Sequence, residues 1–80
     1  MEITFEKFCD DIAEILKVDK KELMEADSIV DELGIDSLRL LELSTKLESM
    51  YNLKYSSASF IEMESVSDLY SYTKKLLEVP

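Results

Sequence analysis

The segment GIDSLRLLEL, residues 34–43, holds the chain's one glycine and places Ser37 directly after Asp36 at the start of a leucine-rich helix. A serine hydroxyl is a point for nucleophilic chemistry or covalent modification. The pattern predicts Ser37 either as the helix N-cap or as a first-turn residue behind an Asp36 cap. In both cases the free backbone amides and the positive end of the helix dipole would favour a phosphoester on the hydroxyl. Gly34 lets the preceding loop turn sharply, so the serine should stand at a corner.

The leucines of this helix point in two directions when residues are placed about 100° apart around its axis. A stripe roughly 100° wide is expected to face the core and contains Leu40, Leu43, Leu47, Met50 and Tyr51. Ser37, Leu38 and Leu41 lie outside this stripe, at roughly 90°, 170° and 130° from its centre. Two interpretations follow. A loop or short helix covers Leu41 and leaves one ordinary exposed leucine, or the two leucines form an apolar docking patch beside the hydroxyl.

Three further helical segments are expected around this helix. In the first, residues 4–16, apolar side chains recur at helical spacing behind a Thr4 N-cap. The segment YSSASFIEME predicts a short helical turn that buries Phe60 and Ile61. The last helix begins at a Ser65–Asp68 capping box, and its predicted inward stripe contains Val66, Leu69, Thr73, Leu76 and Leu77.

Residues 17–34 are irregular and read as a long loop with short helical turns, tied to the core by Val18, Leu23, Ile29 and Leu33. One glycine and a single proline at position 80 leave almost nothing to interrupt the helices from within. The sequence therefore predicts an all-α fold: a small four-helix bundle with three main helices, one short helix and a long first loop. We expect residues 1–80 to form a single domain.

Composition narrows the classes of partner. The formal net charge of −9 disfavours nucleic acid and anionic lipid surfaces and favours basic protein surfaces. No segment approaches the roughly 20 apolar residues of a membrane span, and the acidic N-terminal segment does not resemble a secretory signal. We therefore expect a cytoplasmic protein without membrane insertion, in agreement with its single cysteine.

The sequence also argues against catalysis by this chain. It has no histidine, the usual base near neutral pH. Cys9 lies on the apolar stripe of the first helix and is expected to be buried and inert. Asp10–Asp11 and the pair Glu62 and Glu64 lack EF-hand spacing and are interpreted as solvated acids, so no metal site is predicted. We expect no catalytic residues and no enzymatic activity.

Asp36-Ser37-Leu38, preceded by Glu32-Leu33-Gly34 and followed by Glu42-Leu43, resembles the attachment site of an acyl carrier protein. The resemblance extends over essentially the whole chain, including its length, acidity and order of helices. It implies that Ser37 carries a 4'-phosphopantetheine arm, which a separate transferase adds from coenzyme A and whose thiol holds acyl groups as thioesters. It further implies that Asp36 helps the transferase to position magnesium.

The resemblance places Leu38, Leu41 and Glu42 where the family docks on partner enzymes, and so favours the docking patch over the ordinary exposed leucine. The implied partners are the phosphopantetheinyl transferase and acyl-loading, elongating or acyl-transferring enzymes with basic docking patches, and the carrier is expected to be a monomer. Their pathways include fatty-acid, polyketide, lipid and peptide biosynthesis. The remaining alternative is a small acidic helical adaptor without a prosthetic group.

Arg39 departs from the family pattern, because fatty-acid carriers commonly have another acid just after the D-S-L triplet. Arg39 and Lys46 can both pair with Glu42 along the helix. Arg39 is therefore read either as part of a solvated side with local salt bridges or as a docking residue that alters the choice of partner. A dedicated carrier for a specialised lipid, polyketide or peptide pathway stands beside a carrier for general fatty-acid synthesis.

Overall fold

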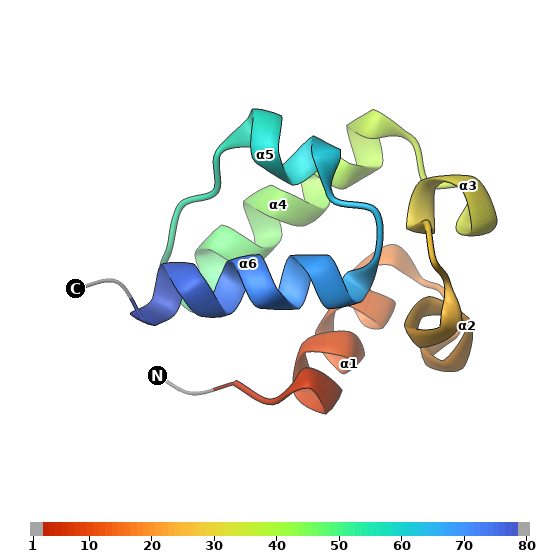
Figure 1. The fold of residues 1–80 in the computed structure, drawn as a ribbon, viewed down its shortest axis with the longest axis horizontal. Helices are drawn as coiled ribbons and strands as arrows, with labels where there is room; N and C mark the ends of the chain where they lie inside the picture. Colours follow the sequence, from red (N-terminus) through yellow and green to blue (C-terminus); the bar gives the residue numbers. More distant parts are fainter. Residues whose placement is uncertain (1–2, 79–80) are drawn as a thin grey trace.

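The computed structural model describes residues 3–78, in which six helices follow one another: α1 (Phe5–Leu16), α2 (Lys20–Glu25), α3 (Ile29–Leu33), α4 (Ser37–Tyr51), α5 (Ser57–Glu62) and α6 (Val66–Glu78) (Figure 1). The three long helices and the short α5 confirm the predicted all-α fold. The predicted long loop contains α2 and α3, which are the short helical turns expected there.

Each of the six helices begins with a side-chain oxygen that accepts a hydrogen bond from a backbone amide in the first turn. The capping residues are Thr4, Asp19, Ser28, Asp36, Ser56 and Ser65. At the last of these, Asp68 also accepts from the Ser65 amide, at 3.4 Å, so the predicted capping box is formed. These caps satisfy amides that a helix start leaves without partners, which explains why the helix starts follow the sequence closely.

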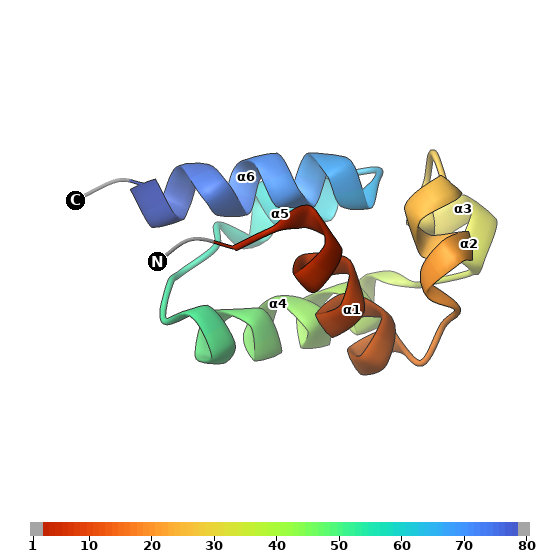
Figure 2. The ribbon, with the colours of Figure 1, turned by 90° about the horizontal axis from the view of Figure 1, so that it is seen from below.

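Helices α4 and α6 run in the same direction along the longest axis of the molecule (Figures 1 and 2), and in the view of Figure 1 α5 lies above this pair and α1 below it. Helix α1 packs against both α4 and α6, and α5 packs against α4. The side chains that meet between these four helices are fully buried or nearly so, and they include Phe8, Ile12, Leu40, Leu43, Leu47, Phe60 and Leu69. Leu23 and Ile29 extend this core to α2 and α3, as predicted for the first loop, while Val18 and Leu33 are partly buried against it.

The buried stripe of α4 differs from the predicted one at both edges. Met50, predicted to face the core, is 47% exposed, whereas Ser44 is 7% exposed. The core face is thus rotated by about 20° toward Ser44. Ser44 lies there without an unsatisfied hydroxyl, because its Oγ donates to the Leu41 carbonyl at 2.7 Å. The exact edge of the stripe depends on where α1 and α5 contact α4, which helical periodicity alone does not contain.

The prediction for α5 was half wrong. Phe60 is fully buried, but Ile61 is 41% exposed. Neighbouring residues on a helix point about 100° apart, so a helix of six residues that turns Phe60 directly into the core leaves the next side chain at its surface. On α6, Val66, Leu69 and Thr73 are buried, as predicted.

Asp11, interpreted from sequence as a solvated acid, is buried. Its carboxylate accepts from Tyr51 Oη at 2.5 Å and from Lys7 Nζ at 2.8 Å, and the residue is only 6% exposed. Burial by itself raises the pKa of the carboxyl, but the hydrogen bonds from Lys7 and Tyr51 outweigh it and hold the pKa below its usual value. The hydrogen bond between Asp11 and Tyr51 joins α1 to the end of α4. Asp10, by contrast, is exposed and pairs with Lys20 at 2.9 Å.

The connection between α4 and α5 is held by polar contacts. The Tyr55 amide donates to Glu48 Oε2 at 2.8 Å, and the Tyr55 hydroxyl lies 2.7 Å from Thr73 Oγ1 in the core. The Ser56 amide donates to the Tyr72 hydroxyl at 3.0 Å. Because both tyrosine contacts involve α6, the position of α5 against α4 depends on α6 as well.

We predict that Asp11→Asn lowers the free energy of unfolding at pH 7 by about 1–3 kcal/mol, since it replaces a hydrogen-bonded buried carboxylate. A carboxyl with a lowered folded-state pKa stabilises the fold above its unfolded pKa of about 4, and this stabilisation is lost as the pH falls through the folded pKa. The difference between wild type and variant should therefore shrink toward pH 2 in urea unfolding curves. Asp10→Asn is the exposed control, and an equal pH dependence of both variants would contradict the assignment.

Candidate functional site

The segment from Gly34 to Leu40 forms a corner pinned at both ends by buried side chains. Gly34 ends α3 in the left-handed region, with φ of 67°, a conformation that costs glycine little. Ile35 is 1% exposed and Leu40 is 2% exposed. Asp36, Ser37 and Leu38 between them are all exposed. The chain must therefore bulge outward at these three residues, as the sequence predicted for the serine.

The cap of α4 is Asp36, which decides between the two predicted positions of Ser37. The Asp36 carboxylate accepts from the Arg39 amide at 2.9 Å, and the Asp36 carbonyl accepts from the Leu40 amide at 3.1 Å. Ser37 is consequently the first residue of α4. Within residues 3–78, neither its hydroxyl nor its amide makes a hydrogen bond to another residue. The hydroxyl therefore lies exposed at the positive end of the helix dipole.

The two leucines outside the core stripe differ in exposure. Leu38 is 66% exposed, the largest value among the exposed large apolar residues. Leu41 is partly buried, and Glu42 is exposed. An apolar side chain is thus presented directly beside Ser37, with a partly covered leucine and an acid one turn further along α4.

Arg39 lies in a different environment from the one expected for a solvated cation. Its Nη2 donates to the carbonyl of Leu16, the last residue of α1, at 2.5 Å, and its side chain is half-buried. Among the described residues, neither Arg39 nor Lys46 forms a salt bridge with Glu42, so the expected local pairs are absent. Sequence reasoning missed the contact with α1. The available signal was a cation in the first turn of its own helix, where the dipole disfavours it.

The other groups considered as reactive lie apart from this corner. Cys9 is fully buried, as predicted, and desolvation raises the pKa of its thiol. Glu62 and Glu64 are exposed. In the part of the chain that the structure describes, no three His, Cys, Asp or Glu residues gather as metal ligands. No helix between residues 3 and 78 has the length and apolar character needed to cross a membrane.

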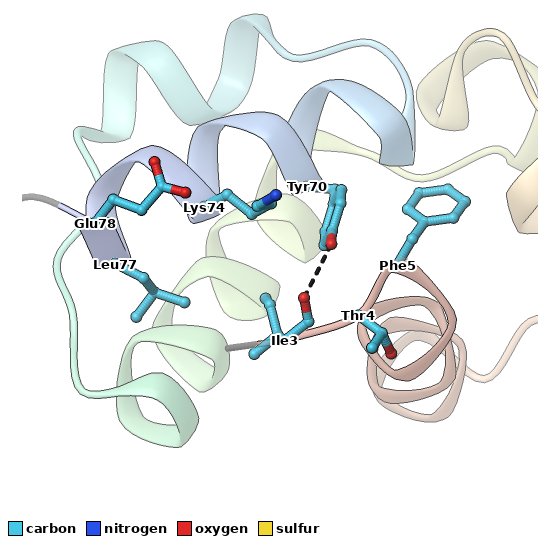
Figure 3. A pocket seen from close by; sticks show the side chains of 7 residues that line it. All are labelled: Ile3, Thr4, Phe5, Tyr70, Lys74, Leu77 and Glu78. Carbon is cyan, nitrogen blue, oxygen red and sulfur yellow. Dashed lines mark hydrogen bonds between the residues drawn. The ribbon is translucent and has the colours of Figure 1, made fainter. Parts of the chain in front are cut away.

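Figure 3 shows a pocket of about 310 Å³ between residues 3–5 and α6, lined by Ile3, Thr4, Phe5, Tyr70, Lys74, Leu77 and Glu78. The Tyr70 hydroxyl closes one side by donating to the Ile3 carbonyl at 2.9 Å, and Lys74 Nζ lies 5.6 Å from the centre of the Tyr70 ring. None of the lining residues belongs to the segment 34–43. The pocket is therefore separate from the Ser37 corner.

Comparison with known proteins agrees with the geometry. Residues 6–73 match the family described as "Phosphopantetheine attachment site". The acyl carrier protein of Thermotoga maritima is 36% identical over 73 residues, which cover 91% of this chain and 90% of that protein. The acyl carrier protein of Clostridium acetobutylicum is 35% identical over 72 residues, covering 90% and 94%. The meromycolate extension acyl carrier protein of Mycobacterium tuberculosis is 32% identical over 82 residues, covering 98% and 71%.

These matches extend over nearly the whole chain and include the corner at Ser37. They confirm the resemblance inferred from Asp36-Ser37-Leu38 and its flanking residues. The prosthetic group of this family is phosphopantetheine, and its members carry intermediates for other enzymes and do not catalyse the reactions themselves. The chain belongs to the acyl carrier protein family.

Proposed function

We propose that Ser37 carries the 4'-phosphopantetheine arm and that the chain shuttles acyl intermediates between biosynthetic enzymes as thioesters of this arm. The observation that carries the proposal is the exposed Asp36-Ser37-Leu38 corner, inside the matched region 6–73. The arm supplies the thiol that forms the thioester. The protein supplies a fixed point of attachment and a surface that partner enzymes recognise.

The proposed modification requires little chemistry from this chain. The Ser37 oxygen forms a phosphoester with the pantetheine phosphate of coenzyme A, its proton passes to a base of the transferase, and the nucleotide part of coenzyme A leaves. With no histidine in the sequence, the base and the catalysis belong to the transferase. Asp36 is proposed to help the transferase position magnesium. Its carboxylate is exposed, and only Oδ1 is used to accept from the Arg39 amide, so the second oxygen can face the transferase.

The phosphoester formed by this modification is also compatible with the start of α4. A phosphoester on Ser37 would lie beside the amides of Ser37 and Leu38, which have no partner among the described residues. Anions at this end of a helix are stabilised by the dipole and by such amides. The modified corner should therefore keep the helical cap.

We propose Leu38, Leu41 and Glu42 as the docking surface for partners, with Arg39 at its edge. An exposed leucine close to acids suits brief docking on basic enzyme patches, in which orientation and fast exchange matter more than affinity. The net charge of −9 would steer such encounters. The partners in this proposal are a phosphopantetheinyl transferase and acyl-loading, elongating or acyl-transferring enzymes. We further propose a monomer that works in the cytoplasm.

The cargo is proposed only by class. The relatives include proteins named acyl carrier protein and others named meromycolate extension acyl carrier protein. This range supports fatty-acid or specialised lipid synthesis, with polyketide and peptide pathways as further hosts for the same arm. Arg39, where fatty-acid carriers commonly have an acid, would point to a dedicated pathway only if its guanidinium contacted the partner directly.

Incubation with coenzyme A, magnesium and a promiscuous phosphopantetheinyl transferase should add one phosphopantetheine to the wild type, measured by intact mass. Ser37→Ala should gain none and keep its helix content, since Asp36 provides the cap. Ser57→Ala is the matched control, because Ser57 is the exposed first residue of α5 behind its own cap. Mass gain by Ser37→Ala would move the site, and no gain by the wild type would favour an adaptor without a prosthetic group.

Asp36→Asn should separate the cap from the proposed role in modification. Asparagine is as good an N-cap as aspartate, so the variant should melt within a few degrees of wild type. It lacks the carboxylate proposed to help the transferase with magnesium, and its modification should therefore slow by about tenfold or more. Thermal melting and mass-based modification rates on one preparation provide the test. A normal rate would remove Asp36 from the proposed site.

Alanine at Leu38 and at Leu43 should cause two different defects. Leu43 is fully buried, and its truncation should cost about 2–5 kcal/mol of stability because it leaves a cavity. Leu38→Ala should melt close to wild type but be modified or loaded more slowly, because one apolar side chain can dominate a small interface. If Leu38→Ala melted early and was modified normally while folded, Leu38 would belong to the core and the proposed docking surface would be contradicted.

A further inference from the structure

Arg39 occupies a position that its own helix does not explain. It is the third residue of α4 and lies in the first turn, which contains no acid. The dipole of α4 is positive at this end, so a cation here is unfavourable for α4 itself. Local pairing does not compensate, because Arg39 forms no salt bridge with the described carboxylates.

Helix α1 provides the explanation. Its last turn contains no basic residue, and the carbonyls at a helix end have no partner within the helix. Arg39 Nη2 donates to one of these, the Leu16 carbonyl, at 2.5 Å. Figure 2 shows that the end of α1 lies near the start of α4, which is the region of this contact. Arg39 therefore acts as a cationic cap for α1 supplied from α4.

The backbone of the same residue holds the corner. The Arg39 amide donates to the Asp36 carboxylate at 2.9 Å, and Leu40, the next residue, is buried. Ser37 lies between the two partners of this hydrogen bond. One residue thus connects the cap beside Ser37 to the end of α1, and the half-buried guanidinium cannot move outward without giving up the Leu16 carbonyl.

We propose that Arg39 is a positioning residue that holds the Ser37 corner against α1 in the orientation in which a transferase modifies it. This inference rests on the proposed attachment at Ser37. It differs from a docking role for Arg39, in which the guanidinium would contact the partner enzyme directly. Positioning acts on the reactive geometry, so it predicts a loss of kcat, whereas docking through an exposed charge predicts a change of KM that salt screens.

The test uses Arg39→Met, Arg39→Lys and the control Lys46→Met, which removes the same charge from an exposed position of α4. Modification by a phosphopantetheinyl transferase is followed by intact mass at low and high salt, below the melting temperature of every variant. Arg39→Met should lower kcat by about tenfold with little change in KM and no relief by salt. Arg39→Lys should recover most of the rate, because one nitrogen makes the contact, and Lys46→Met should behave as wild type.

Hydrogen exchange is the second measurement and does not depend on modification. The backbone amide of residue 39 is bonded to Asp36. It should exchange faster in Arg39→Met than in wild type, and at the wild-type rate in Lys46→Met. An effect confined to KM that disappears with salt, or unchanged kinetics, would overturn the inference. If the wild type itself gained no mass, the attachment proposal would fail and the positioning role with it, and the exchange data would still report whether Arg39 holds the corner.

Discussion

Burial of Ile35 and Leu40 on either side of three exposed residues is the constraint on which the functional end of this protein depends. The two apolar side chains are drawn into the core from positions five residues apart, and the backbone between them has to turn outward. Gly34 supplies the left-handed turn before the corner, and the Asp36 carboxylate supplies the cap after it. The exposed serine is therefore a consequence of how its neighbours are buried.

Three of the nine cations of this acidic chain help to hold its helices together. Lys7 pairs with the buried Asp11, Lys20 bridges Glu6 and Asp10, and Arg39 bonds to the end of α1. These contacts lie on α1 and between α1 and its neighbours. Acids outnumber cations by nine in the whole sequence, which suits a carrier that must be recognised by several basic surfaces and released from each.

Much of the fold follows from local patterns in the sequence. The helix starts at Thr4 and Ser65 could be predicted, and the start of α4 to within one residue, because a capping side chain bonds to an amide within the same turn. The main buried stripes of α1, α4 and α6 could be predicted because helical periodicity marks one face of each helix. The Ser37 corner belongs to this class, since a glycine, a cap and two flanking apolar residues all lie within seven residues. The family could likewise be inferred from these residues in their context.

Tertiary structure decided which side chains far apart in the sequence become partners. The buried Asp11 carboxylate is paired because Tyr51, forty residues away, donates to it, and Arg39 is engaged because α1 ends beside it. Met50 is exposed because the contacts of α1 and α5 with α4 set the edge of its buried stripe, and helical periodicity does not contain those contacts. The sequence by itself determined the three long helices, the caps at Thr4 and Ser65 and the exposed serine, since these depend on residues within a turn or two of one another. Only the packing of the helices decided which charged side chains are buried and which cation caps the end of α1. These interactions form between segments far apart in the chain, and the sequence does not give the distances between such segments in space.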